Sequence, residues 1–240
     1  MGSAGPRPIR SGRGAGLIGS TVTAGERGAT VTGVRDDFLR GAGAVLDALS
    51  DPAVAAAWDR PSALADQTVG SLAGHLARGG VWVVADYLDL DAPATAVHAT
   101  VAGYFAQVAH LDEGDHRAIR DRGAALAAEG PAAVVARLGE RLPALAARLA
   151  DEPPDRLVPV FGGGMALDAY LGTRLVEQVV HLDDLSRSVP GLGSTVPDDL
   201  VARVVEVGAA VAVERHGPTA VLRHLFRTDV AGPPVVPVLG

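Results

Sequence analysis

Hydrophobic residues recur at helical spacings along most of the chain from Val34 onward. Residues 34–49 follow this pattern and carry acidic side chains in the first turn, which is typical of an amphipathic helix. Thr68 is placed to cap a second helix that runs to about Leu88. The same patterning predicts helices over about 95–129 (interrupted near 112–115), 131–150, 167–188, 197–216 and 220–226.

Between these helices, residues 151–168 are rich in proline and glycine, so we expect a connection that holds a short strand or hairpin. The chain shows no internal repeat and no clear domain boundary after the first thirty residues. An all-α fold is therefore predicted, an antiparallel helical bundle with additional C-terminal helices.

Composition agrees with this fold class. Hydrophobic residues make up 48% of the chain but aromatic residues only 4%, so the core must consist mainly of Ala, Val and Leu. Alanine is the best helix former and fills a sheet sandwich poorly. The low aromatic content also predicts few aromatic groups for shaping a substrate pocket.

Charge and hydropathy limit the partners. The net charge is −7 and no basic cluster occurs outside the N-terminal tail, which disfavours a nucleic-acid partner. No apolar run approaches the roughly 20 residues of a membrane span, so we expect a cytoplasmic protein without a membrane partner. Oligomeric state has no signature in the sequence.

Residues 1–30 are glycine-rich, basic and without periodicity, and we expect a disordered tail there, with the folded domain over 31–240. Residues 14–19 of this tail read GAGLIG and match the G-x-G-x-x-G pattern. That pattern indicates a dinucleotide site only when it follows a strand and opens a helix, and no strand-like segment precedes it here.

Two absent residue types, cysteine and lysine, narrow the function further. The chain has no cysteine, so a disulfide, a thiolate metal site and a cysteine nucleophile are excluded. It has no lysine either, since all 21 basic residues are arginine, and this removes Schiff-base chemistry and the P-loop lysine. Any sulfur nucleophile must come from outside the chain.

The predicted helix over 167–188 contains the segment LVEQVVHLDDL. On a helical wheel, an arc of about 80° holds five polar or aromatic residues, at about 100° per residue. These residues are Tyr170, Arg174, Glu177, His181 and Asp184. One interpretation is a solvated helix face, because charged residues are usually exposed. The other is a metal site, because Glu and His at i and i+4 point the same way and a third ligand from another helix would complete the set.

His75 is the histidine best placed to be that third ligand. It lies in the middle of the second predicted helix, beside Gly74 and Gly79, whose small size would let a neighbouring helix approach closely. Taken alone, His75 is either a hydrogen-bonded core residue or a ligand. The remaining histidines are expected at the surface: His98, His110, His116, His216 and His224.

The segment TVGSLAGHLARG, followed about a hundred residues later by TRLVEQVVHLDDLSRSV, resembles the metal-binding domain of mycothiol-dependent maleylpyruvate isomerases. This domain belongs to the DinB-like superfamily of thiol-dependent metalloenzymes. The similarity continues through GDHRAIRDRGAALAAEGP and HGPTAVLRHLFR, and so covers most of residues 34–230. It implies a four-helix bundle whose zinc ligands are His75, Glu177 and His181.

Family members that isomerise maleylpyruvate carry a further α/β domain after the bundle. Here about fifty residues follow the fourth helix, and their pattern is helical. The resemblance therefore implies thiol-dependent chemistry more directly than that particular isomerisation. A bundle that binds a metal or small molecule without catalysis is the alternative, and metal-dependent hydrolysis ranks third.

The leading hypothesis is a transferase or isomerase that uses mycothiol as a thiol cosubstrate on a small electrophile. Two histidines and one carboxylate leave coordination positions open, as in catalytic zinc sites, and the same ligands suit Fe²⁺ or Ni²⁺. Arg174, one turn before Glu177, is a candidate to pair with a carboxylate of the substrate or the protein. Asp184, one turn after His181, either orients that imidazole or is a solvated charge. Asp183, on another face, is expected to be exposed.

Overall fold

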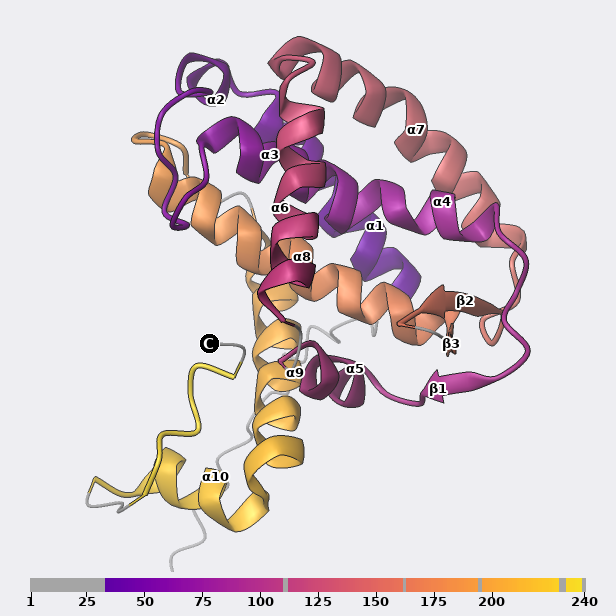
Figure 1. The fold of residues 1–240 in the computed structure, drawn as a ribbon, viewed down its shortest axis with the longest axis vertical. Coiled ribbons are helices and arrows are strands. Elements are labelled where there is room, and N and C mark those ends of the chain that lie inside the picture. Colours follow the sequence, from indigo (N-terminus) through magenta and orange to yellow (C-terminus); the bar gives the residue numbers. More distant parts are fainter. Residues whose placement is uncertain (1–32, 110–111, 162, 194–195, 229–231, 239–240) are drawn as a thin grey trace, which may run out of the picture. The chain divides into compact units, whose positions relative to one another are not determined.

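The computed structural model describes residues 33–109, 112–161, 163–193, 196–228 and 232–238 (Figure 1). The predictions for residues 1–30, including the glycine motif at 14–19, lie outside these residues. The helices are α1 (Val34–Leu49), α2 (Pro52–Ala56), α3 (Val69–Ala77), α4 (Val83–Leu88), α5 (Val101–Val108), α6 (Glu113–Ala127), α7 (Pro131–Asp151), α8 (Leu167–Ser188), α9 (Asp198–His216) and α10 (Pro218–Phe226). A π-helical turn, η1 (Arg78–Trp82), joins α3 to α4, and the strands are β1 (Ala96–His98), β2 (Leu157–Val160) and β3 (Gly163–Ala166).

Four helical segments form the bundle: α1, the continuous α3–η1–α4 segment, α7 and α8. Helix α1 contacts α7 and α8, and α3 contacts the same two helices from the other side. The apolar faces meet in one core, to which the four segments contribute the fully buried Phe38, Leu72, Leu138 and Leu171. The prediction of an all-α, DinB-like four-helix bundle is confirmed.

The second predicted helix begins where the sequence indicates. The Thr68 hydroxyl accepts a hydrogen bond from the Ser71 backbone N–H at 3.1 Å and caps α3. The helical path then continues through η1 and α4 to Leu88. The sequence did not predict the π turn, which contains the adjacent glycines Gly79 and Gly80.

The predicted start of the third helical region near residue 95 was wrong, whereas its interruption before α6 is present. Residues 96–98 form β1, which pairs in parallel with β3, while β2 pairs with β3 in the antiparallel direction. Helix α5 begins only after Thr100, whose hydroxyl accepts from the Gly103 N–H. Glycine in β3 makes room for β1, because a Cβ on Gly163 would lie 2.3 Å from Val97 Cγ1.

The predicted hairpin in 151–168 is confirmed as β2 and β3, and β3 leads directly into α8. Figure 1 shows the three strands grouped at the N-terminal end of α8. After the bundle, α9 packs on α5 and α8, and α10 packs on α9, so the predicted C-terminal helices are also confirmed. Within the described part of the chain, no helix combines the length and hydropathy of a membrane span.

Two glycines let α6 approach α3 closely. A Cβ on Gly74 of α3 would lie 2.3 Å from the Gly123 carbonyl oxygen of α6, and a Cβ on Gly123 would lie 3.1 Å from His75 Cβ. The expected close approach at Gly74 is therefore present. Helix α6 in turn supports the backbone that carries His75.

We expect Gly74→Ala to lower the free energy of unfolding by about 1–3 kcal/mol, because its methyl group meets backbone that can move only with the whole helix. Gly139→Ala is the matched control, since a Cβ on this α7 glycine meets no atom within 4 Å. It should stabilise by up to about 1 kcal/mol through helix propensity. Urea denaturation compares the two variants, and equal effects would contradict the packing argument.

Candidate metal centre

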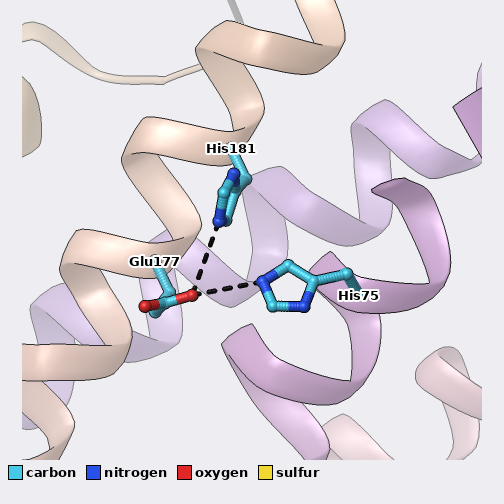
Figure 2. A group of neighbouring side chains, drawn as sticks. All are labelled: His75, Glu177 and His181. Atoms are coloured by element: carbon cyan, nitrogen blue, oxygen red, sulfur yellow. Dashed lines mark hydrogen bonds and ion pairs between the residues drawn. The ribbon is translucent and has the colours of Figure 1, made fainter. Parts of the chain in front are cut away.

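Two helices bring His75, Glu177 and His181 together (Figure 2). His75 extends from α3, while Glu177 and His181 lie one turn apart on α8. His75 Nε2 is 3.3 Å from Glu177 Oε2, and His181 Nε2 is 3.5 Å from the same oxygen. The two imidazole centroids are 4.8 Å apart, with the rings nearly perpendicular at 87°. Three potential ligand atoms therefore face a common point between α3 and α8.

The polar stripe of α8 is not a solvated helix face. Tyr170, Arg174 and Asp184 are 2%, 6% and 8% exposed, and the side chains of Glu177 and His181 are 21% and 20% exposed. The solvated-face interpretation of the sequence was therefore wrong for this stripe. The helix buries polar groups here because α3 and η1 supply partners for them.

The π turn holds α8 in register with α3. Arg174 Nη1 donates to the Gly79 carbonyl at 2.9 Å, and Gln178 Nε2 donates to the Gly80 carbonyl at 2.9 Å. These two side chains stand on either side of Glu177 in the sequence. A π turn shifts carbonyls out of the regular α-helical pattern and often occurs at functional sites. Gly79 packs beside the His75 ring, where a Cβ would come into ordinary van der Waals contact with His75 Cε1 at 3.4 Å.

Asp184 contacts His181 on the side away from Glu177. Asp184 Oδ2 lies 3.0 Å from His181 Nδ1, so the contact expected from the sequence is present. A carboxylate accepts hydrogen bonds, so Nδ1 carries a hydrogen; the protonated ring also presents Nε2–H to Glu177, and loss of that second hydrogen leaves an Nε2 lone pair for a metal. Asp183 is exposed, as predicted.

Neighbouring charges and hydrogen bonds shift the pKa of both Glu177 and His181. Burial alone would raise the pKa of Glu177, but the hydrogen bonds from His181 and His75 and the charge of Arg174 hold its pKa well below the usual range. Burial alone would lower the pKa of His181, but Asp184 and Glu177 outweigh it and raise the pKa to about 9. An ionised carboxylate at the centre of the group follows from these interactions.

The donor set fits a divalent transition metal. Two imidazole nitrogens and one carboxylate oxygen, all within 4.8 Å of one another, are ligands that catalytic zinc sites use, and Fe²⁺ also accepts them. The hydrogen bond from His181 to Asp184 is the outer contact that metal-binding histidines commonly make. Among the described residues, no second cluster of His, Cys, Asp or Glu has this proximity.

A cavity of about 160 Å³ adjoins this group, and His75 and Glu177 form part of its wall. The three tyrosines of the chain, Tyr87, Tyr104 and Tyr170, also line it. The expectation that few aromatic groups would shape a pocket was therefore wrong, because the scarce aromatic residues converge here. A cavity near 150 Å³ holds a ligand about the size of benzene.

Arg174 lines the cavity, and its hydrogen-bond partners within the described residues are uncharged, so of the two expected partners only a substrate carboxylate stays a prediction. It is buried, and it donates from Nε to Thr173 Oγ1 at 3.0 Å and from Nη2 to the Tyr104 hydroxyl at 2.9 Å, besides its bond to Gly79. Within the described residues it forms no ion pair with a carboxylate. Its guanidinium also lies over the Tyr170 ring, 4.9 Å from the centroid.

The sequence analysis missed several other cavity residues. Arg78, Arg122 and Phe161 also line the wall, as does Tyr104. The adjacent glycines 79 and 80 inside a helical pattern were a signal of local irregularity that points to this place. The residues from α5, α6 and the β2–β3 turn carry no comparable signal, because tertiary packing alone brings them to α3 and α8.

The remaining histidines differ in their environments. His98 is 6% exposed, so its predicted surface position was wrong; strand pairing buries it, and burial lowers its pKa. Its ring packs against Tyr104, with centroids 5.8 Å apart. His116 is exposed as predicted, and His216 and His224 are half-buried. His110 lies outside the described residues.

Comparison with known proteins gives one family match. The family model of the mycothiol maleylpyruvate isomerase N-terminal domain matches residues 27–186, which include α1 to α8 up to the end of the polar stripe. Neither a curated protein nor a solved structure matches the chain at a significant level.

We expect Asp184→Asn to weaken zinc binding by about 10- to 100-fold, because an amide can present its N–H₂ to His181 and no longer fixes the ring tautomer. Asp183→Asn is the matched control, since it removes an exposed carboxylate at the neighbouring position of the same helix. Titration of metal-free protein against a zinc indicator measures both affinities. Equal affinities would show that the contact between Asp184 and His181 has no role in binding.

Proposed function

Because the chain belongs to the mycothiol maleylpyruvate isomerase N-terminal domain family, we propose that it is a metal-dependent enzyme that uses mycothiol as an external thiol. The thiol attacks a small electrophilic substrate, and the reaction is either S-transfer or cis–trans isomerisation. The observation that carries the proposal is the convergence of His75, Glu177 and His181 beside a cavity whose wall includes His75 and Glu177.

In this proposal His75, Glu177 and His181 hold the metal through two imidazole nitrogens and one carboxylate oxygen, with zinc favoured and Fe²⁺ or Ni²⁺ as alternatives. A bound divalent metal lowers the pKa of a thiol that it coordinates. The chain itself contains no cysteine, which agrees with a sulfur nucleophile that enters from solution.

The side chains around the ligands have separate roles in this proposal. Asp184 keeps the His181 ring oriented with Nε2 toward the site. Arg174 and Gln178 hold Glu177 in place, because Arg174 donates to the Gly79 carbonyl and Gln178 donates to the Gly80 carbonyl of the opposite helix. The aromatic wall limits the substrate to a small molecule and keeps bulk water from the reacting atoms.

A non-catalytic metal-binding or small-molecule-binding bundle is the second candidate. The helical character of the segment after α8 favours it, because α9 and α10 pack on α5, α8 and one another and line none of the cavity at the ligand group. The two candidates share the metal site and differ in turnover.

We expect protein prepared without added metal to contain close to one zinc per chain by elemental analysis. His181→Ala should lose it, because one of the three donors is gone, whereas His116→Ala, an exposed histidine on α6, should retain it. Conversion of a panel of small electrophiles in the presence of mycothiol, followed both as thioether formation and as cis–trans isomerisation, then tests catalysis. A rate that saturates with mycothiol and disappears in His181→Ala is the expected result.

Each outcome separates the candidates. One zinc per chain without thiol-dependent turnover would favour the binding protein. No zinc in any of the three proteins, and none taken up on reconstitution, would contradict the metal-dependent enzyme and the metal-binding form of the second candidate.

A further inference from the structure

Arg174 is a buried cation without a neutralising carboxylate at contact distance in the described part of the chain. It is 6% exposed, and its hydrogen bonds go to Thr173, the Gly79 carbonyl and Tyr104, all of them uncharged. The rings of Tyr170 and Tyr104 lie 4.9 and 5.7 Å from the guanidinium carbon and compensate part of the charge. Glu177 on the same cavity wall interacts with Arg174 electrostatically but forms no ion pair with it, and a buried charge is costly unless it is paired, so the positive charge of Arg174 still favours an oxyanion in the adjoining cavity.

Tyr104 is the group through which Arg174 meets the cavity. A guanidinium can only donate hydrogen bonds, so the Tyr104 oxygen accepts the 2.9 Å bond from Arg174 Nη2. The phenolic hydrogen therefore remains available, and no described residue accepts it. Tyr104 is 7% exposed and lines the cavity together with Glu177 and His75.

The Tyr104 ring is held firmly from several sides. Its centroid lies 5.2 Å from that of Phe105, 5.4 Å from Phe161 and 5.8 Å from His98. These contacts come from α5, the β2–β3 turn and β1, so the ring position does not depend on one neighbour. A donor fixed in this way, polarised by a buried cation, is preorganised for a negatively charged oxygen.

We infer that Tyr104 donates a hydrogen bond to a substrate oxygen that carries or gains negative charge, and that Arg174 is the positioning residue behind it. The role of Tyr104 in turnover rests on the proposed function. The chemical step is written for a conjugated carbonyl compound, the kind of electrophile that the family already implies; the inference itself concerns Tyr104 and Arg174.

The reaction of this class develops charge at the carbonyl oxygen. The thiolate sulfur forms a bond to the β-carbon with one of its lone pairs, and the π pair of the double bond shifts so that an enolate oxygen results. Tyr104 donates its hydrogen bond to that oxygen. In S-transfer the α-carbon then takes a proton from solvent. In isomerisation the former double bond rotates, the electron pair returns and the carbon–sulfur bond breaks.

The test uses 4-nitrophenol as a stable oxyanion probe, because its phenolate form has a distinct visible absorption. The dye is titrated near neutral pH, where both of its forms are populated, into zinc-loaded and metal-free protein. Wild type should bind the phenolate form in both states. Tyr104→Phe removes a single oxygen atom and should bind it about tenfold or more weakly, since a hydrogen bond to a charged group is lost.

Tyr87→Phe is the matched control, because it removes a hydroxyl from the same cavity wall that has no hydrogen bond within the described residues. It should keep the wild-type dye affinity within about twofold. Arg174→Gln should retain dye binding but shift the absorption of the bound dye toward the neutral form. Circular dichroism checks that each variant is folded.

The inference is overturned if wild type does not bind the phenolate, or if Tyr104→Phe binds it as well as wild type does. Failure of the proposed function would show separately, as a lack of zinc or of thiol-dependent turnover. The dye titration of metal-free protein depends on neither zinc nor turnover, so it tests Tyr104 by itself. Where turnover with a conjugated carbonyl substrate is present, Tyr104→Phe should lower kcat by about 100-fold or more with zinc content unchanged.

Discussion

The candidate site depends on two hydrogen bonds between α8 side chains and the backbone of the opposite helix. Arg174 and Gln178 donate to the carbonyls of Gly79 and Gly80, and Glu177 lies between them in the sequence. The π turn and its two glycines make these carbonyls accessible, which a regular α-helix with larger side chains would not. The bonds fix the register of α3 against α8, and that register brings His75 within 3.3 Å of Glu177.

The same arrangement gives the cavity two chemically different sides. Glu177 and the two histidines supply donors for a cation, while Arg174 and Tyr104 supply positive charge and a hydrogen-bond donor. Arg174 connects the two sides, because its Nη1 donates to the Gly79 carbonyl in the π turn and its Nη2 donates to the Tyr104 hydroxyl. A small molecule in the cavity would lie between the candidate ligand group and the pair formed by Arg174 and Tyr104.

Much of the fold, and the three side chains that the structure brings together, could be predicted from the sequence. The bounds of α1 and α8, the cap at Thr68 and the hairpin before α8 follow from local patterns, and His75, Glu177 and His181 follow from the resemblance of two segments. The environment of Arg174 could not be predicted, because its partners come from η1 and α5. The burial of His98 could not be predicted either. It results from the pairing of β1 with β3, which lies about 65 residues away in the sequence.

Zinc X-ray absorption spectroscopy, with and without mycothiol, tests the central claim that this group binds a metal with a position open to an external thiol. The account predicts nitrogen and oxygen ligands, including two imidazoles, in the zinc-loaded protein, and one added sulfur ligand when mycothiol is present. Since the chain has no cysteine, such a thiolate sulfur comes from the added thiol. A spectrum without imidazole ligands, or one that mycothiol leaves unchanged, would contradict the account.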